Sequence, residues 1–192
     1  MGGVKKLAYQ LDFLAAMKAI FVPVDPLFHF IIFIIFAVVI SGPLYLVYQL
    51  KKRVSLQTWL LFIGMAVIPV AGLLGVSLLH TGSGWQLENG RLQIKTAVWA
   101  KETIELEKAR VALVESTGPW QAEWRTGGLG LPGLAAGRFV FQNGETALYF
   151  RHLGSPRRVV LAVDNRYYVL VHPGVEELYE ELIARGAQPA EL

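Results

Sequence analysis

Arginine side chains are the groups in this sequence whose type and spacing best suit binding chemistry. Two of them stand at either end of a glycine- and leucine-rich segment at 127–137, and three lie on both sides of a short turn at 153–156. A guanidinium presents a planar fork of N–H donors that fits a phosphate or a lipid headgroup. The candidate binding arginines are Arg125, Arg138, Arg151, Arg157 and Arg158. The alternative is that they are ordinary surface arginines, solvated or paired with carboxylates.

Three leucines of the 127–137 segment complete the candidate binding residues: Leu129, Leu131 and Leu134. They either pack beneath the folded domain or face a partner or a lipid surface, and the pattern leaves both open. The same stretch matches G-x-G-x-x-G at 128–133. A dinucleotide site needs such glycines to open a helix after a strand. Because a strand is expected almost directly after the motif, nucleotide binding is not predicted.

No grouping of residues predicts catalysis, a cofactor or a metal site. The four histidines are scattered, and neither a Ser-His-Asp set nor a pair of carboxylates occurs at a suitable spacing. The chain has no cysteine, which excludes disulfides and thiolate ligands. We therefore expect a non-enzymatic protein without a cofactor.

The positive net charge does not come from the C-terminal part of the chain. From Thr81 onward, the chain has 12 Lys and Arg residues and 13 Asp and Glu residues, so this part is close to neutral. The surplus lies before it, at Lys5, Lys6 and Lys18 and in the Lys51-Lys52-Arg53 segment. Nucleic-acid binding needs a basic face on the domain itself, so it is not expected.

Two long apolar runs, at 27–50 and 54–79, contain no carboxylate. Each exceeds the roughly 20 residues that a helix needs to cross a bilayer. Only the three cations at 51–53 separate the runs, so the two predicted spans run antiparallel as a transmembrane helical hairpin. The sequence thus predicts a bacterial plasma (inner) membrane protein with the lipid bilayer as a partner.

The segment before the first run, residues 4–22, places apolar side chains on one face at helical spacing. It predicts a juxtamembrane helix that lies either on the lipid headgroups or against the rest of the protein. The expected units are therefore 1–26, the hairpin at 27–80 and a β domain at 81–192. Cations are equally numerous before and between the spans, so the positive-inside rule does not orient the hairpin.

From about residue 85 the pattern changes from continuously apolar to alternating, which is typical of β-strands. Turn pairs at Asn89-Gly90, Asn143-Gly144 and Asp164-Asn165 separate these runs, which predict about seven or eight strands in an antiparallel sandwich or barrel. After Pro173, apolar residues recur at helical spacing, and Gly186 suits the position just past a helix. The sequence predicts an all-β domain capped by one C-terminal helix.

A set of short motifs marks residues 85–186. It comprises the first hairpin at 85–94, the Arg-Thr-Gly-Gly-Leu-Gly-Leu-Pro-Gly stretch at 125–133, Gly-Arg-Phe at 137–139, Asn143-Gly144 and the His-Pro-Gly-Val-Glu-Glu-Leu stretch at 172–178. Together they resemble the membrane-anchored bacterial pleckstrin-homology (PH-like) domains. The resemblance implies a strongly bent sandwich of seven strands capped by one helix, although relatives usually carry an acidic residue where this chain has His172. That family has no single established activity.

The expected function is that of a non-enzymatic binding or scaffold protein with a PH-like domain, which engages a protein partner or itself as a homo-oligomer at the plasma membrane. Related membrane-anchored domains commonly face the cytoplasm, which favours that side for the β domain. Two alternatives stay open. One is a sensor of anionic lipid headgroups that uses the arginine clusters, and the other is an accessory subunit of a membrane transporter or enzyme complex.

Overall fold

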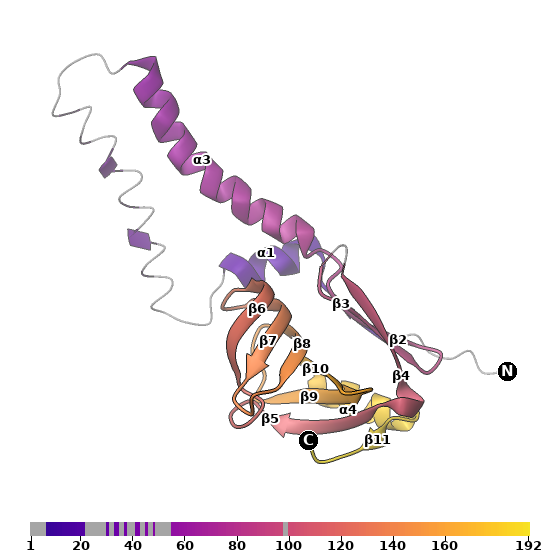
Figure 1. Cartoon of the computed structure of the whole chain (residues 1–192). Helices are drawn as coiled ribbons and strands as arrows, with labels where there is room; N and C mark the ends of the chain where they lie inside the picture. The colour runs from indigo at the N-terminus through magenta and orange to yellow at the C-terminus, as the bar shows by residue number, and fades with distance from the viewer. Residues whose placement is uncertain are drawn as a thin grey trace.

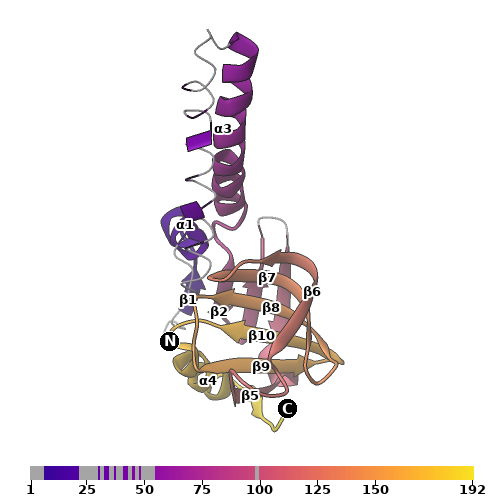
Figure 2. The same cartoon turned by 90° about the vertical axis from the view of Figure 1, so that its left-hand side faces the viewer.

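Two β-sheets enclose a common apolar core and form the body of the molecule, from which one long helix projects (Figure 1). The computed structural model describes residues 7–21, 30, 33–34, 37, 41–42, 45, 48, 55–97 and 100–192. Figure 2, turned by 90°, shows the same helix standing above the sheets. The bounds of the elements follow.

The first sheet has four antiparallel strands, in the order β1 (Leu7–Gln10), β2 (Gly84–Glu88), β3 (Arg91–Lys95) and β4 (Lys101–Glu105). Between β2 and β3, Asn89 and Gly90 both have positive φ, 50° and 70°. A two-residue hairpin turn requires this backbone, and Asn and Gly adopt it at little cost. The predicted Asn-Gly hairpin is confirmed.

The second sheet has seven strands in the order β11-β5-β9-β10-β8-β7-β6. Their bounds are β5 (Arg110–Glu115), β6 (Ala122–Gly130), β7 (Leu134–Phe141), β8 (Thr146–His152), β9 (Arg157–Val163), β10 (Arg166–Val171) and β11 (Gln188–Pro189). Neighbours are antiparallel except for β8 with β10 and β5 with β11, which are parallel. Asp164 and Asn165 form the tight β9–β10 turn with positive φ at both, as predicted.

The main core lies between the facing sides of the two sheets. Side chains such as Leu92 and Ile104 from the first sheet meet Phe150 and Leu161 from the second. A short 3-10 helix, η1 (Leu106–Lys108), carries the chain from one sheet to the other. Helices cover two ends of the core: α1 (Phe13–Phe21) and α4 (Val175–Ala184).

Helix α4 confirms the predicted C-terminal cap. Val175, Leu178 and Leu182 are buried in the main core, so the spacing of apolar residues after Pro173 does correspond to one buried face. The helix ends at Ala184, and Gly186 follows with φ of 105°, a backbone that glycine adopts without a steric penalty.

The predicted fold class is wrong in its sheets. Instead of one sandwich of about seven strands, the described chain forms a four-stranded antiparallel sheet and a seven-stranded mixed sheet. Two strands, β1 and β11, were not predicted from the sequence, because they are only 4 and 2 residues long. Both add to sheet edges formed by residues far away in sequence, and the parallel pair β8–β10 also joins strands that are not consecutive. Such pairing is set by tertiary packing, not by local alternation.

The N-terminal segment is not the single helix predicted for residues 4–22. Residues 7–10 are strand β1, which pairs antiparallel with β2, and α1 begins only at Phe13. Asp12 separates the two elements, and its side chain accepts a hydrogen bond of 2.6 Å from the Ala15 N–H, which is the geometry of a helix N-cap. Of the two surfaces predicted for this segment, it therefore lies against the rest of the protein. Residues 1–6 lie outside the described residues.

The predicted membrane spans are also wrong. Within the part of the chain that the structure describes, no helix combines the length and the apolar character needed to cross a membrane. The run at 54–79 contains one helix, α3 (Leu56–Leu79). Only one side of its C-terminal part contacts the body of the protein: Leu73 and Val76 pack on the main core and Ser77 is buried, while Leu74, Leu78 and Leu79 are exposed. Most of 27–50, and 51–53, lie outside the described residues. The plasma-membrane location drawn from the spans falls with them.

A buried polar network fastens β1 to the rest of the fold. The Tyr9 hydroxyl lies 2.5 Å from His152 Nδ1, and the Tyr9 ring stacks on His172 with 4.2 Å between centroids. Trp85 Nε1 donates to His172 Nε2 at 2.8 Å, and His172 Nδ1 lies 2.8 Å from the Pro173 carbonyl oxygen. These contacts assign the neutral ring with its proton on Nδ1, because Nε2 accepts.

Acid should weaken this network. Burial lowers the pKa of His172, while the Pro173 carbonyl, Glu176 and Glu177 act in the opposite direction. The pKa of His152 is also lowered, first by burial and then by the charge of His172. Both rings resist protonation in the folded state. Their stabilisation is fully present above about pH 6.5, the ordinary histidine pKa, and is lost as the pH falls from there through the lowered folded-state pKa.

We expect the free energy of unfolding of the full chain, measured by urea titration with tryptophan fluorescence, to fall below pH 6.5 by at most about 1.4 kcal/mol per pH unit for each histidine. His172→Gln cannot take up a proton, so its unfolding free energy should depend less on pH. Equal pH slopes for the variant and the wild type would contradict the assignment.

Leu178→Asp and Leu182→Asp should each destabilise the fold by more than about 4 kcal/mol, because an unpaired charge would enter the main core. Both side chains are almost completely buried. Circular dichroism melts would show the loss. Glu177→Asp places the same residue on the exposed side of α4 and serves as the control; a wild-type melt for either leucine variant would refute this account of the cap.

Candidate binding groove between the two sheets

Two of the candidate arginines form exposed ion pairs. Arg157 lies 3.4 Å from Glu115, and Arg138 lies 3.5 Å from Glu102. Arg125 is exposed on β6, opposite Phe139 of β7, and has no ion pair within the described residues. The structure therefore does not bring Arg125, Arg138 and Arg157 together into one site.

Arg151 and Arg158 do come together, around the Tyr149 hydroxyl on the outer face of the second sheet. Burial raises the pKa of Tyr149, while the charges of both arginines act in the opposite direction. Arg158 is only 5% exposed and donates hydrogen bonds to the carbonyl oxygens of Trp120 and Ser116. Arg151 donates to two carbonyl oxygens at 131–132, both at 2.8 Å. Both arginines therefore hold neighbouring loops to the sheet.

The glycine- and leucine-rich segment is mostly strand, not a loop. Its residues belong to β6 and β7, which approach closely where Gly128 and Gly137 meet: a Cβ on Gly128 would lie 2.2 Å from the Ala136 carbonyl oxygen. Leu134 is fully buried, and Leu129 and Leu131 pack against the main core. Of the two alternatives for these leucines, the structure therefore favours packing beneath the domain: Leu134 is completely buried, and Leu129 and Leu131 are partly buried.

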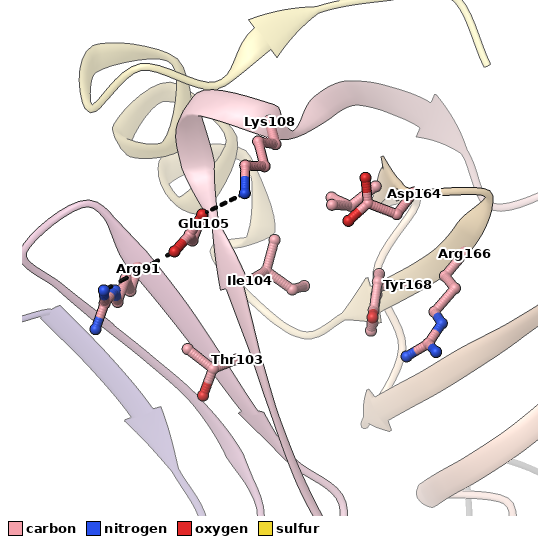
Figure 3. A pocket seen from close by; sticks show the side chains of 9 residues that line it. Arg91, Thr103, Ile104, Glu105, Lys108, Asp164, Arg166 and Tyr168 are labelled. Carbon is pink, nitrogen blue, oxygen red and sulfur yellow. Dashed lines mark ion pairs between the residues drawn. The ribbon is translucent and has the colours of Figure 1, made fainter.

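A groove between the two sheets is a candidate site (Figure 3). It has a volume of about 630 Å³, within the range usual for ligand sites. One wall comes from β3, β4 and η1, and the other from the β9–β10 turn and β10. The lining residues are Arg91, Thr103, Ile104, Glu105, Lys108, Val163, Asp164, Arg166 and Tyr168. A smaller cavity of about 140 Å³ adjoins it, shares Arg166 and Tyr168, and reaches Glu102 and Arg138.

Strand β4 presents an unpaired edge to this groove. β4 is the last strand of its sheet and pairs only with β3. The backbone bonds from Leu106 to Gly90 and from Thr96 to Ala100 show that even-numbered residues of β4 bond to β3. The N–H and C=O groups of Thr103 and Glu105 therefore point away from β3, and no backbone partner meets them within the described residues.

Charges in the groove are largely paired with one another. Glu105 lies 2.8 Å from Lys108 and 3.9 Å from Arg91; the hydrogen bond and charge of Lys108 lower the pKa of Glu105, and Glu105 raises that of Lys108. Tyr168 donates to Glu102 at 2.9 Å. Burial, together with Glu102, raises the pKa of Tyr168, while Arg166 acts in the opposite direction.

The groove residues were not among those singled out from the sequence. The strand around 102–106 and the Asp164-Asn165 turn were both predicted, and each carries part of the lining. Their juxtaposition depends on how the two sheets pack, which no local pattern encodes. In the described chain no three His, Asp or Glu side chains are grouped so as to hold a metal ion. What the groove offers is hydrogen-bonding backbone and charged side chains.

Leu134→Ser should lower the free energy of unfolding by at least about 3 kcal/mol, because it removes a fully buried leucine and buries a hydroxyl. Arg125→Ala, an exposed position on the neighbouring strand, should change it by no more than about 0.5 kcal/mol. Urea titration of both variants measures the difference. A small effect for Leu134→Ser would mean that the 127–137 segment faces outward.

The chain was compared with models of protein families, with curated proteins and with solved structures. No family model, curated protein or solved structure matches it. The resemblance of residues 85–186 to bacterial pleckstrin-homology domains therefore stays a prediction.

Proposed function

We propose that this chain is a non-enzymatic binding module that takes up an extended segment of a partner protein in the groove between the sheets, by strand addition to β4. One observation carries the proposal: three consecutive residues of β4, Thr103, Ile104 and Glu105, line the groove. Side chains of consecutive strand residues point to opposite faces, so it is the edge of β4 that borders the space. An unpaired edge beside an open groove is the arrangement that peptide-binding sheets use.

The other sheet edges suit strand addition less well. β6 is long and exposed, but its pairing with β7 shifts register at two places, and such bulges twist an edge away from flat pairing. β11 has only two residues, one of them Pro189. β1 is four residues long and joins α1 across Asp12. β4 combines regular pairing on one side with a groove on the other.

The main alternative from the sequence, a lipid-headgroup sensor, finds less support in the arginines. Arg138 and Arg157 are ion-paired, and Arg151 and Arg158 bond to backbone carbonyls. A headgroup would have to replace these partners. Neither self-association nor a role as accessory subunit is favoured by a specific contact.

The test is a selection of linear peptides of random sequence, displayed on phage, against the purified full chain. Peptides that bind the groove should depend on the outward N–H of Thr103. Thr103→Pro removes that donor without touching the β3–β4 hydrogen bonds, so we expect it to weaken binding at least tenfold. Thr103→Val keeps the N–H and should bind as the wild type does.

Because proline also restricts the backbone, a second measurement supports the first. Methylation of alternate backbone nitrogens in a selected peptide should abolish binding in one register and leave it intact in the other, since only alternate residues bond to a neighbouring strand. Failure to enrich any peptide, or enriched peptides that bind Thr103→Pro and Thr103→Val equally, would refute strand addition at β4.

A further inference from the structure

Arg166 lies on the wall of the groove that β10 forms. It is the first residue of β10, directly after the Asp164-Asn165 turn, and it lines both the large and the small cavity. Figure 3 shows its side chain beside Tyr168, on the wall that faces β4. The Arg166 backbone pairs with Val163 of β9, and from Tyr167 onward β10 pairs with both β9 and β8. This cation is therefore presented from a rigid element.

Arg166 is also the cation of the groove whose charge is not balanced. The two cavities are lined by four cations, Arg91, Lys108, Arg138 and Arg166, and by three carboxylates, Glu102, Glu105 and Asp164. Arg91 and Lys108 pair with Glu105, the charge of Asp164 also acts on Lys108, and Arg138 pairs with Glu102. Within the described residues Arg166 forms no ion pair, and its side chain interacts with the Tyr168 hydroxyl. That hydroxyl already donates to Glu102, so it can only accept from Arg166.

A strand added to β4 would direct side chains at Arg166. The side chains of Glu102 and Ile104 point from β4 toward the second sheet, since Glu102 meets Tyr168 and Ile104 is buried in the main core. Alternate residues of a neighbouring strand share that face. Every second side chain of the bound segment would therefore enter the space that Arg166 borders. A guanidinium has five N–H donors, and one hydroxyl acceptor leaves most of them for a ligand.

We infer that the partner segment carries an acidic side chain, Asp or Glu, at an inward-facing position, and that Arg166 binds its carboxylate. The inference rests on the proposed strand addition at β4 and adds its specificity. A carboxylate matches the guanidinium fork with two parallel hydrogen bonds, and it balances the one excess cation. A basic side chain at the same position would meet an uncompensated like charge, so the groove discriminates against it.

The same phage selection, run on the full chain and on Arg166→Gln, tests the inference. Peptides selected on the wild type should be enriched in Asp or Glu at one alternate position, and those selected on Arg166→Gln should not. A selected peptide and its Glu→Gln or Asp→Asn analogue are then titrated against both proteins by fluorescence anisotropy. We expect at least a tenfold loss from either change alone and little further loss when the two are combined.

Two control variants test whether the effect is specific to the guanidinium of Arg166. Arg125→Gln removes another exposed arginine without an ion pair among the described residues, but outside the groove, and should leave affinity unchanged. Arg166→Lys keeps the charge and loses the fork, so its affinity should lie between those of the wild type and Arg166→Gln.

Peptides that need the Thr103 N–H but show no acidic preference, or whose Glu→Gln loss persists in Arg166→Gln, would overturn the role of Arg166 and leave strand addition in place. Absence of any Thr103-dependent peptide would overturn both.

Discussion

Burial of apolar side chains between two sheets that share no backbone hydrogen bonds is the constraint on which this structure depends. The hydrophobic effect is non-directional, so it holds the sheets face to face without joining their edges. α1 and α4 cover ends of that core, and the remaining rim becomes the groove. Ile104 and Tyr168 show the connection directly, because both belong to the main core and both line the groove. The groove is thus a consequence of how the core closes.

Polar links at the rim keep the two sheets at a fixed separation. Glu102 projects from β4 and receives both the Tyr168 hydroxyl and the Arg138 guanidinium from the second sheet. A carboxylate half withdrawn from water needs such partners, and meeting them ties β4 to β7 and β10. At the opposite side of the first sheet, the Trp85–His172 hydrogen bond ties β2 to the start of α4. The groove is therefore largely formed before any ligand enters, which lowers the ordering cost of binding.

Local chemistry predicted what is local in this fold. The Asn89-Gly90 and Asp164-Asn165 turns and helix α4 follow from backbone preferences and periodicity, and each lies where the pattern placed it. Continuous hydropathy along the chain predicted spans that the described helices do not provide. The edge strands β1 and β11 and the parallel pairs depend on long-range contacts, so a single sequence holds little signal for them.

The arginines illustrate why clusters along a sequence are poor guides to sites. Arg151, Arg157 and Arg158 lie within eight residues of one another in the sequence. Because side chains alternate along a strand, however, Arg157 pairs with Glu115 at the surface and Arg158 donates to buried carbonyl oxygens. A side chain with five donors is well suited to holding several carbonyls of a loop, and a cation used in this way has little left for a ligand. Arg166 is distant in sequence from these arginines, yet the packing of the sheets places it on the wall of the groove, where it has no ion pair among the described residues. Capacity for binding here follows from which donors the fold leaves unused.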